Sequence, residues 1–247
     1  MNQANFKNKE RSNKEKSNKE KLIVALDVAD FSSAKKLVDE IDDEVIFYKV
    51  GLELMMSGDY FPLIKWLKNK NKKVFADLKL YDISQTVARA VKNLAQHEID
   101  LLTIHCASDE IMKSAAQNKD KMQIIAVTVL TNLDEKDLNK MGFDPEISLQ
   151  NLVLKKAKMA LDCGLDGVVS SALEAKNLRQ KLGKNFLIVS PGIRLEKVLN
   201  DDQKRVADVE TALVNGSSHL VVGRPITGNQ NPKKIAQQFN QLIENFS

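Results

Sequence analysis

Cysteine is scarce in this sequence, where only Cys106 and Cys163 occur. Two cysteines are too few for a disulfide framework, and their spacing is not that of zinc ligands, so we interpret both as buried thiols. No apolar run is long enough to span a bilayer, and residues 1–21 lack the apolar segment of a secretory signal. These absences predict a cytoplasmic protein with no membrane partner.

Residues 22–247 also lack a net charge. The formal charge of +4 comes from residues 1–21, which hold seven basic and three acidic side chains. This low-complexity segment, rich in Lys, Asn and Glu, cannot bury enough apolar surface to offset its ordering entropy, so we expect a disordered tail, or at most a frayed helix. Its basic residues alternate with glutamates and no stacking aromatics are interleaved, which argues against nucleic-acid binding. A noncatalytic RNA-binding protein acting through the tail stays an alternative of another class.

The remaining chain alternates short apolar runs with amphipathic segments. Hydrophobic residues make up 43% and charged residues 28% of the sequence, as in ordinary globular proteins. The apolar runs lie at residues 22–26, 45–50, 74–78, 101–105, 124–130, 167–170, 186–189 and 220–222. Eight strands alternating with helices predict an α/β protein with a single (β/α)8 TIM barrel over residues 22–247. A doubly wound sheet is the alternative, but no glycine-rich loop follows the first run.

One apolar run carries charges of both signs. It begins as a buried strand and then places Asp77 and Lys79 two residues apart, with Asp82 three residues further on. Residues two apart in a strand point to the same face. A strand of a parallel barrel is covered by helices on its outer side and by the barrel core on its inner side. Ionised side chains on such a strand therefore require a charged partner or a pocket. An isolated Asp-x-Lys pair can equally be a structural ion pair, so the interpretation as an enzyme site depends on the other strand ends.

Further ionisable side chains follow the neighbouring strands. Asp27 closes the first predicted strand and Lys49 lies in the second, both at inward-facing positions. A barrel would bring them to one cavity with Asp77 and Lys79. At about 4 Å and an effective dielectric near 20, each contact between opposite charges is worth about 4 kcal/mol, so the four groups stay charged there only as a paired array. We interpret His105, at the end of the fourth strand, as a structural residue.

Two glycine-containing loops follow the seventh and eighth predicted strands. Residues 190–194 read Ser-Pro-Gly-Ile-Arg, and residues 223–226 read Gly-Arg-Pro-Ile. Loops at these places form the usual phosphate site of a barrel, and Arg224 can supply a bidentate donor. For either loop alone, an ordinary glycine turn with a surface arginine is the alternative. The polar segment 195–205 between them is long enough to fold over a ligand as a lid.

Together these motifs resemble the orotidine 5'-phosphate decarboxylase family. The resemblance covers residues 22–246 and rests on Ala25-Leu26-Asp27, Lys49-Val50-Gly51, residues 77–83 with Thr86, and residues 126–131, 191–194 and 222–225. It implies a homodimeric (β/α)8 barrel that converts orotidine 5'-monophosphate to UMP and CO2, the last step of de novo pyrimidine nucleotide synthesis. It also implies that neither a metal nor an organic cofactor takes part.

The resemblance further implies roles for the matching residues. Lys79 would be the catalytic proton donor to C6, Asp77 would lie beside the scissile carboxylate, and Lys49 would complete the charged row and contact the substrate. Asp82 would be the fourth catalytic residue, in one charge network with Lys49, Asp77 and Lys79, and with Ile83 and Thr86 it would reach across into the partner subunit's site. The other substrate ligands would be Asp27 at the ribose, Thr131 by the pyrimidine, and Arg194, Gln203, Gly223 and Arg224 on the phosphate side.

Some positions depart from the family pattern. Tyr81 stands where His is frequent, Ser84-Gln85 replaces a common Pro-Asn, and Asn132 follows Thr131 where Ser is often seen. These changes affect the loop that carries Asp82 but leave the four charged positions intact. The alternative within the same fold is a related phosphosugar barrel, a ketogulonate-phosphate decarboxylase or hexulose-phosphate synthase, which shares the Asp-x-Lys-x-x-Asp core but uses Mg²⁺.

Overall fold

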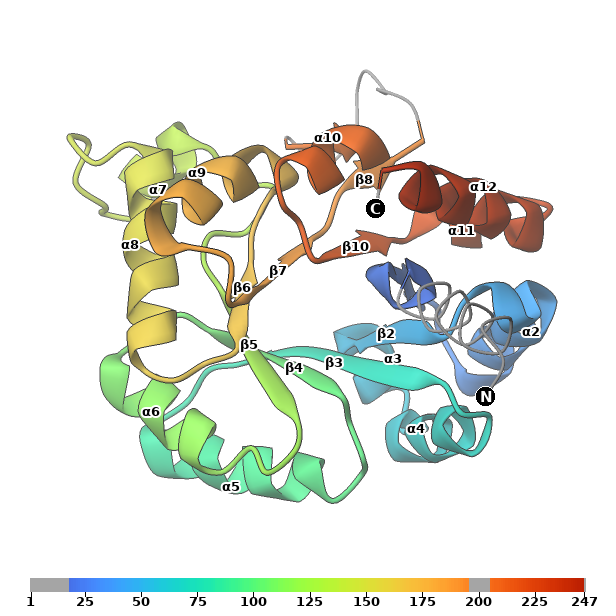
Figure 1. Ribbon diagram of the computed structural model, residues 1–247. Helices are drawn as coiled ribbons and strands as arrows, with labels where there is room; N and C mark the ends of the chain where they lie inside the picture. The colour runs from blue at the N-terminus through green and yellow to red at the C-terminus, as the bar shows by residue number, and fades with distance from the viewer. Residues whose placement is uncertain (1–17, 196–204, 247) are drawn as a thin grey trace, which may run out of the picture.

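In the computed structural model, which describes residues 18–195 and 205–246, eight short apolar segments pair in parallel and close into a barrel (Figure 1). The strands are β1 (Leu22–Ala25), β2 (Phe47–Gly51), β3 (Lys73–Leu80), β4 (Leu101–His105), β5 (Gln123–Val127), β6 (Gly167–Val169), β7 (Leu187–Ser190) and β10 (His219–Val222). They follow one another around the barrel in chain order, and β10 closes it against β1. The predicted (β/α)8 barrel is therefore confirmed.

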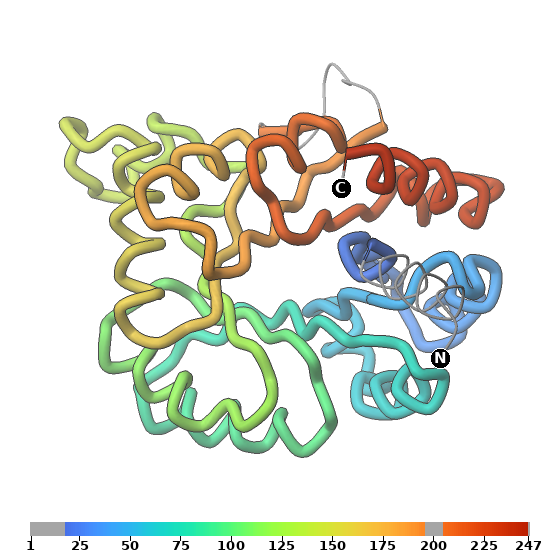
Figure 2. Tube along the Cα trace, viewed as in Figure 1, coloured from blue at the N-terminus to red at the C-terminus, as the bar shows by residue number. Residues whose placement is uncertain are grey.

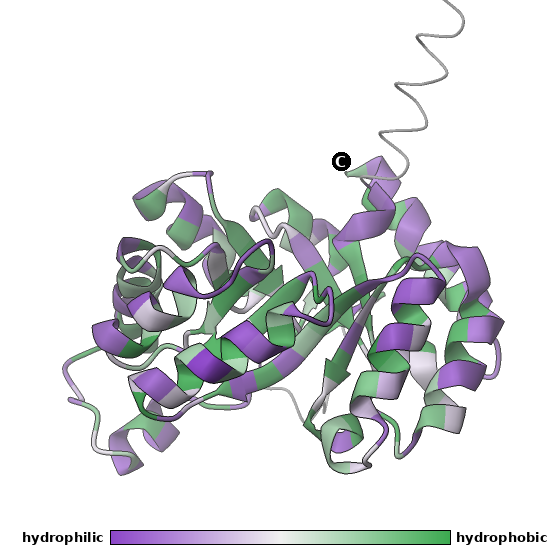
Figure 3. Cartoon of the chain, turned by 90° about the horizontal axis from the view of Figure 1, so that it is seen from below, coloured by the Kyte–Doolittle hydropathy of each residue, from purple (hydrophilic) through white to green (hydrophobic). Residues whose placement is uncertain are grey.

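Alternation along the strands creates two layers of buried apolar side chains. Ile23, Phe47 and Phe75 belong to a cluster inside the barrel. Their neighbours, such as Val24 and Tyr48, belong to the larger cluster between the strands and the helices. Figure 3 shows mostly hydrophobic strands in the centre and helices striped with hydrophilic residues around them. Because successive side chains of a strand point to opposite faces, the same strands build both layers.

Amphipathic segments between the strands form the outer ring of helices. The ring comprises α2 (Phe31–Ile41), η1 (Asp42–Glu44), α3 (Leu52–Met56), α4 (Tyr60–Asn69), α5 (Ser84–Ala95), α6 (Asp109–Gln117), α7 (Glu135–Lys140), α8 (Leu149–Asp162), α9 (Ala172–Leu182), α10 (Val209–Val214), α11 (Arg224–Thr227) and α12 (Pro232–Asn245). Several helices begin at a side-chain cap, such as Asp30, whose Oδ1 accepts from Ser33 N at 2.8 Å. Such caps satisfy backbone donors that a helix start leaves without a partner.

The last helix packs against the first part of the chain (Figure 2). Asn240 of α12 donates through Nδ2 to the carbonyl of Glu44 at 2.8 Å, and Lys233 Nζ lies 3.0 Å from Asp42 Oδ2. Both acceptors belong to η1. The two ends of the barrel sequence are thus joined by side-chain contacts as well as by the pairing of β1 with β10.

The residues just before β1 contact the N-terminal end of the barrel. Residues 18–21 are helical, Asn18 is buried, and Glu20 Oε2 lies 2.8 Å from Lys73 Nζ at the start of β3. These four residues, which we assigned to the tail, pack as part of the barrel domain. The rest of the predicted tail, residues 1–17, lies outside the described residues.

His219 faces the same end of the barrel. Its ring packs edge-on against Phe47, with centroids 5.8 Å apart. Its buried Nδ1 has no hydrogen-bond partner among the residues that the structure describes. Burial, reinforced by the positive charge of Lys73, lowers the pKa of His219 to about 4. The ring is therefore neutral at pH 7.

The fifth strand ends earlier than the sequence pattern predicts. We expected a strand over residues 124–130, but β5 stops at Val127. Thr128 then donates both its backbone N–H and its hydroxyl to the Val169 carbonyl, at 3.4 and 3.0 Å. Because both Thr128 donors bond to the same carbonyl, the regular pairing of β5 with β6 ends at Thr128. The apolar residues after Thr128 belong to the loop over the barrel.

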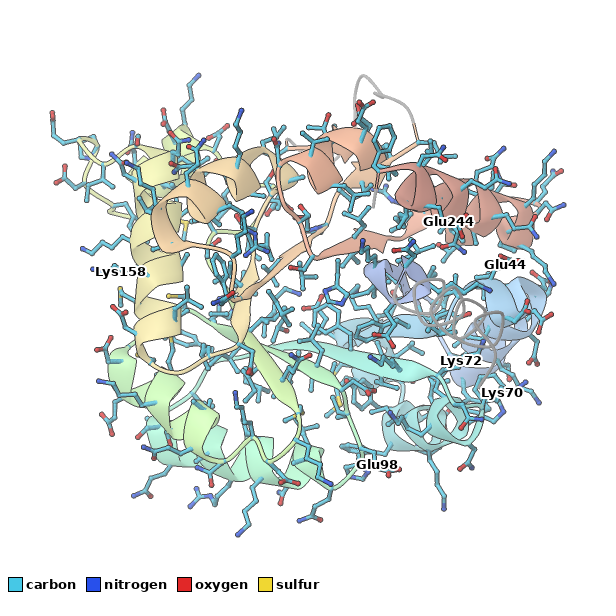
Figure 4. All side chains as sticks on the ribbon, viewed as in Figure 1. Glu44, Lys70, Lys72, Glu98, Lys158 and Glu244 are labelled. Atoms are coloured by element: carbon cyan, nitrogen blue, oxygen red, sulfur yellow. The ribbon has the colours of Figure 1, made fainter. Side chains whose placement is uncertain are left out.

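The outer surface is charged, and the two cysteines are buried as predicted. Charged side chains, among them Glu98 and Lys158, are exposed on the outside of the barrel (Figure 4). Cys106 and Cys163 are free and buried, and burial raises the pKa of the Cys106 thiol to about 11. Within the two described ranges, no helix has the length and apolar character that a membrane crossing requires. The cytoplasmic location stays a prediction.

Candidate active site

A cavity of about 620 Å³ opens where the barrel strands end. Its volume lies within the usual range for small-molecule sites. Its lining consists of Ala25, Asp27, Lys49, Phe75, Asp77, Lys79, Val127, Val129, Leu130, Thr131, Asn132, Val169, Val189, Pro191, Gly192, Arg194, Val221, Gly223 and Arg224. These residues come from the carboxyl ends of the strands and the loops that follow, which is where barrel enzymes place their sites.

A row of four alternating charges runs across β1, β2 and β3 at the edge of this cavity. Lys49 Nζ lies 2.7 Å from Asp27 Oδ1 and 3.5 Å from Asp77 Oδ2. Lys79 Nζ lies 2.8 Å from the same Asp77 Oδ2. The predicted convergence of these four side chains is therefore present in the structure.

Asp77 is the centre of this row. Its side chain is 14% exposed, and this burial favours the neutral acid. The positive charges of Lys49 and Lys79, with hydrogen bonds from Lys79 and Thr103, outweigh burial and lower the pKa of the Asp77 carboxyl. The carboxylate is thus ionised at neutral pH and holds two ammonium groups beside the cavity.

Lys79 reaches the row from an irregular piece of backbone. Its φ is +48°, in the left-handed region that side chains other than glycine seldom adopt. The pairing of β3 with β4 shifts register between Ala76 and Leu80, on either side of it. Simple alternation predicted that Asp77 and Lys79 share a face. They do so, but through a bulge instead of a regular strand.

Two arginines line the cavity from the loops after β7 and β10. Arg194 lies in the short strand β8 (Ile193–Arg194), which pairs with β9 (Ala207–Asp208), and Arg224 is the first residue of α11. Gly192, with a φ of 75°, makes the turn between β7 and β8. Guanidinium groups beside a glycine-containing loop are suited to bind a phosphate dianion.

Comparison with known proteins identifies the family. Residues 20–239 match the model of the family described as "Orotidine 5'-phosphate decarboxylase / HUMPS family". The chain belongs to this family. The resemblance seen in the sequence is thereby confirmed.

Individual relatives agree with the family match. A protein of Methylococcus capsulatus named orotidine 5'-phosphate decarboxylase is 51% identical over 224 residues, covering 90% of this chain and 91% of that protein. One of Nitrobacter winogradskyi with the same name is 46% identical over 219 residues, covering 88% and 90%. The crystal structure of orotidine 5'-phosphate decarboxylase from Lactobacillus acidophilus superposes with a TM-score of 0.80 at 33% identity, covering 90% of this chain and 98% of that one.

Most of the residues that the family resemblance singled out lie together, but some do not. Asp27, Lys49, Asp77, Lys79, Thr131, Arg194, Gly223 and Arg224 all line the cavity. Asp82 and Ile83 are exposed and Thr86 is half-buried, and none of the three lines the cavity of this single chain. Gln203 and most of the predicted lid lie outside the described residues. The individual roles stay predictions.

Sequence reasoning missed the apolar floor of this decarboxylase-family site and two polar supports. Residues such as Phe75, Val127 and Val221 look like ordinary barrel core in the sequence. Thr103 is hidden in the apolar run of β4, where no pattern distinguishes it. Arg205 pairs with the buried Glu174 and donates to the carbonyl of Leu130 at 2.8 Å, which ties the segment after residue 204 to the loop beside the cavity.

Neither Tyr81, which stands where the family frequently has His, nor His105 lines the cavity. Tyr81 is 72% exposed, and its ring packs edge-on against His105 with centroids 5.7 Å apart. Burial, followed by the positive charges of Lys79 and Lys156, lowers the pKa of His105. His105 does not line the cavity, which agrees with its interpretation as a structural residue.

Proposed function

We propose that this protein decarboxylates orotidine 5'-monophosphate to UMP and CO2, the last step of de novo pyrimidine nucleotide synthesis. One observation carries the proposal: Lys79 Nζ lies 2.8 Å from the Asp77 carboxylate, which is 14% exposed, beside a cavity whose lining also includes Arg194 and Arg224. The family match and the names of the relatives support the same reaction.

The charged row suits the chemistry of this reaction. Breaking the bond between C6 and the carboxylate leaves the electron pair on C6, and the pyrimidine offers no adjacent electron sink. Stabilisation must therefore come from a cation already in place. The Lys79 ammonium can stabilise the developing charge and then give its proton to C6, after which solvent reprotonates the amine. Asp77 holds that ammonium in position, and Lys49 pairs with the same Asp77 carboxylate.

Other residues of the cavity would bind the ribose, the pyrimidine and the phosphate of the substrate. Asp27 would bind the ribose hydroxyls, Thr131 would lie by the pyrimidine, and Gly223 with the two arginines would bind the phosphate. Gln203 is proposed on the phosphate side from the family resemblance alone. The apolar floor excludes water from beneath the ring, which strengthens electrostatic interactions inside the site.

A homodimer would complete the site. Asp82, Ile83 and Thr86 lie outside the cavity of one chain, and Tyr81 and Ile83 expose 72% and 68% of their surface. Exposed apolar side chains next to a carboxylate support an interface in which Asp82 enters the partner subunit's cavity. Inactive Lys79→Ala and Asp82→Ala chains, refolded together, should then regain about a quarter of wild-type activity, because half of the dimers hold one intact site. Absence of any regained activity would contradict a shared site.

The function itself is tested by the loss of orotidine 5'-monophosphate absorbance with the purified protein in the presence of EDTA. The expected result is full activity with chelator, since the proposed chemistry uses only side chains of the protein. Activity that EDTA abolishes, or turnover of a phosphosugar instead, would favour the magnesium-dependent alternative.

A further inference from the structure

Thr103 lies in the middle of β4 and is fully buried. Its hydroxyl donates to Asp77 Oδ1 at 2.9 Å and accepts from the backbone N–H of Lys79 at 3.0 Å. A single hydroxyl thus contacts both members of the Asp77–Lys79 pair.

The pairing of β3 with β4 explains why a side chain is needed here. β3 advances four residues from Ala76 to Leu80, while β4 advances two from Leu102 to Ile104. Lys79 lies within this bulge, and its left-handed φ of +48° takes its N–H out of the regular ladder. The hydroxyl of Thr103 takes the place of the missing backbone acceptor. A buried N–H without an acceptor would be costly, so this contact holds the strained residue in place.

The two oxygens of the Asp77 carboxylate have different partners. Oδ1 accepts from Thr103, while Oδ2 lies 2.8 Å from Lys79 Nζ and 3.5 Å from Lys49 Nζ. Because the carboxylate is planar, fixing Oδ1 fixes the direction of Oδ2. The Asp77 side chain is only 14% exposed, so water has little access to replace the Thr103 hydroxyl if that hydroxyl is removed.

We infer that Thr103 is a positioning residue for the reaction, whose hydroxyl orients the Asp77 carboxylate and the Lys79 backbone so that the Lys79 ammonium faces the substrate. This inference rests on the proposed decarboxylase function and names a residue on which that function depends. Thr103 does not line the cavity and acts only through Asp77 and Lys79.

Thr103→Ser and Thr103→Ala form a matched pair, because both lose the methyl group and only serine keeps the hydroxyl. We expect kcat of Thr103→Ala to be about 10- to 100-fold below that of Thr103→Ser, because Thr103→Ala loses a hydrogen bond to a charged group. KM should change less than about threefold, because Thr103 does not line the cavity. Thr128→Val serves as the control. It also removes a buried hydroxyl, but one that donates to the Val169 carbonyl at 3.0 Å, and it should leave kcat nearly unchanged.

The pH dependence gives a readout that a purely structural role would not move. Asp77 is faced by Lys49 from β2, Lys79 on its own strand, His105 from β4 and Tyr60 from α4, with Asp27 beyond Lys49. The Thr103 hydrogen bond lowers the pKa of Asp77, so its loss raises that pKa. The acid limb of kcat should then lie at higher pH in Thr103→Ala than in Thr103→Ser.

Equal kcat and equal acid limbs in the two variants would overturn the inference. If Thr103→Ala does not fold, Thr103→Val, which keeps the side-chain volume, takes its place in the comparison. A wild-type protein inactive on orotidine 5'-monophosphate would refute the proposed function instead. Titration of the Asp77 carboxyl carbon by NMR needs no substrate and would then decide whether Thr103 holds Asp77, with an unchanged pKa counting against it.

Discussion

Replacing Lys79 by alanine should abolish turnover while leaving the protein folded. The ammonium lies 2.8 Å from Asp77 Oδ2, and at an effective dielectric near 20 a pair at that distance interacts by about 6 kcal/mol. A carbanion developing at C6 at a similar distance would be stabilised to the same order. If about 4 kcal/mol of this arises only in the transition state, its loss slows the reaction about 10³-fold.

Loss of the proton donor adds a further factor of about 10² to 10⁴ to the effect of Lys79→Ala. We therefore expect kcat/KM to fall by about 10⁵-fold or more. Stopped or continuous absorbance assays at high enzyme concentration measure such a fall, and circular dichroism with a thermal melt checks the fold. Asp77 keeps Lys49 and Thr103 as partners, so the variant should remain folded.

Lys73→Ala is the matched control for Lys79→Ala. Lys73 begins the same strand, but at the opposite end of the barrel, where its Nζ pairs with Glu20 at 2.8 Å. This partly exposed pair is worth about 1 kcal/mol or less, so stability should change little and activity not at all. A folded Lys79→Ala variant that keeps more than about a hundredth of wild-type kcat would refute Lys79 as the proton donor.

Three further predictions concern stability. The pKa of His219 is about 4 in the folded protein, below its unfolded value, so protonation of His219 at low pH favours the unfolded chain. The free energy of unfolding, measured with urea, should therefore be about 2 kcal/mol lower at pH 5 than at pH 7. His219→Phe should lose this pH dependence of stability. A chain starting at residue 18 should melt like the full chain, whereas one starting at residue 22 should lose about 1 kcal/mol with the Glu20 contact; equal melts of the two would contradict the packing described. Arg205→Met should cost about 3 kcal/mol, because it leaves the buried Glu174 charge without an opposite charge. Adding Glu174→Gln should recover part of this loss, as denaturant titration can measure.

The barrel and its charged row could be predicted because both follow from local patterns. Eight apolar runs with amphipathic segments between them specify the strands, and the charges at Asp27, Lys49 and Asp77 occur at inward positions by simple alternation. The closure of the barrel then brings these strand ends together. No long-range information beyond the fold class was needed for this part of the site.

The supports of the site could not be predicted, because they depend on contacts between distant segments. The bulge at Lys79 and its partner Thr103 arise only when β3 is placed against β4. The end of β5 at Val127 depends on a carbonyl of β6, at Val169. The composition of residues 18–21 likewise gives no sign of the contact between Glu20 and Lys73. Hydrophobic patterning does not report such single polar contacts.

The two buried cysteines make this protein a convenient subject for thiol-specific probes. No other cysteine occurs in the 247 residues, and burial keeps the Cys106 thiol, with a pKa of about 11, protonated at neutral pH. A maleimide reagent should therefore find little background on the native chain. A single cysteine introduced at the exposed Ile83 could carry a spin label or a fluorophore, and its signal would test the proposed assembly of two chains.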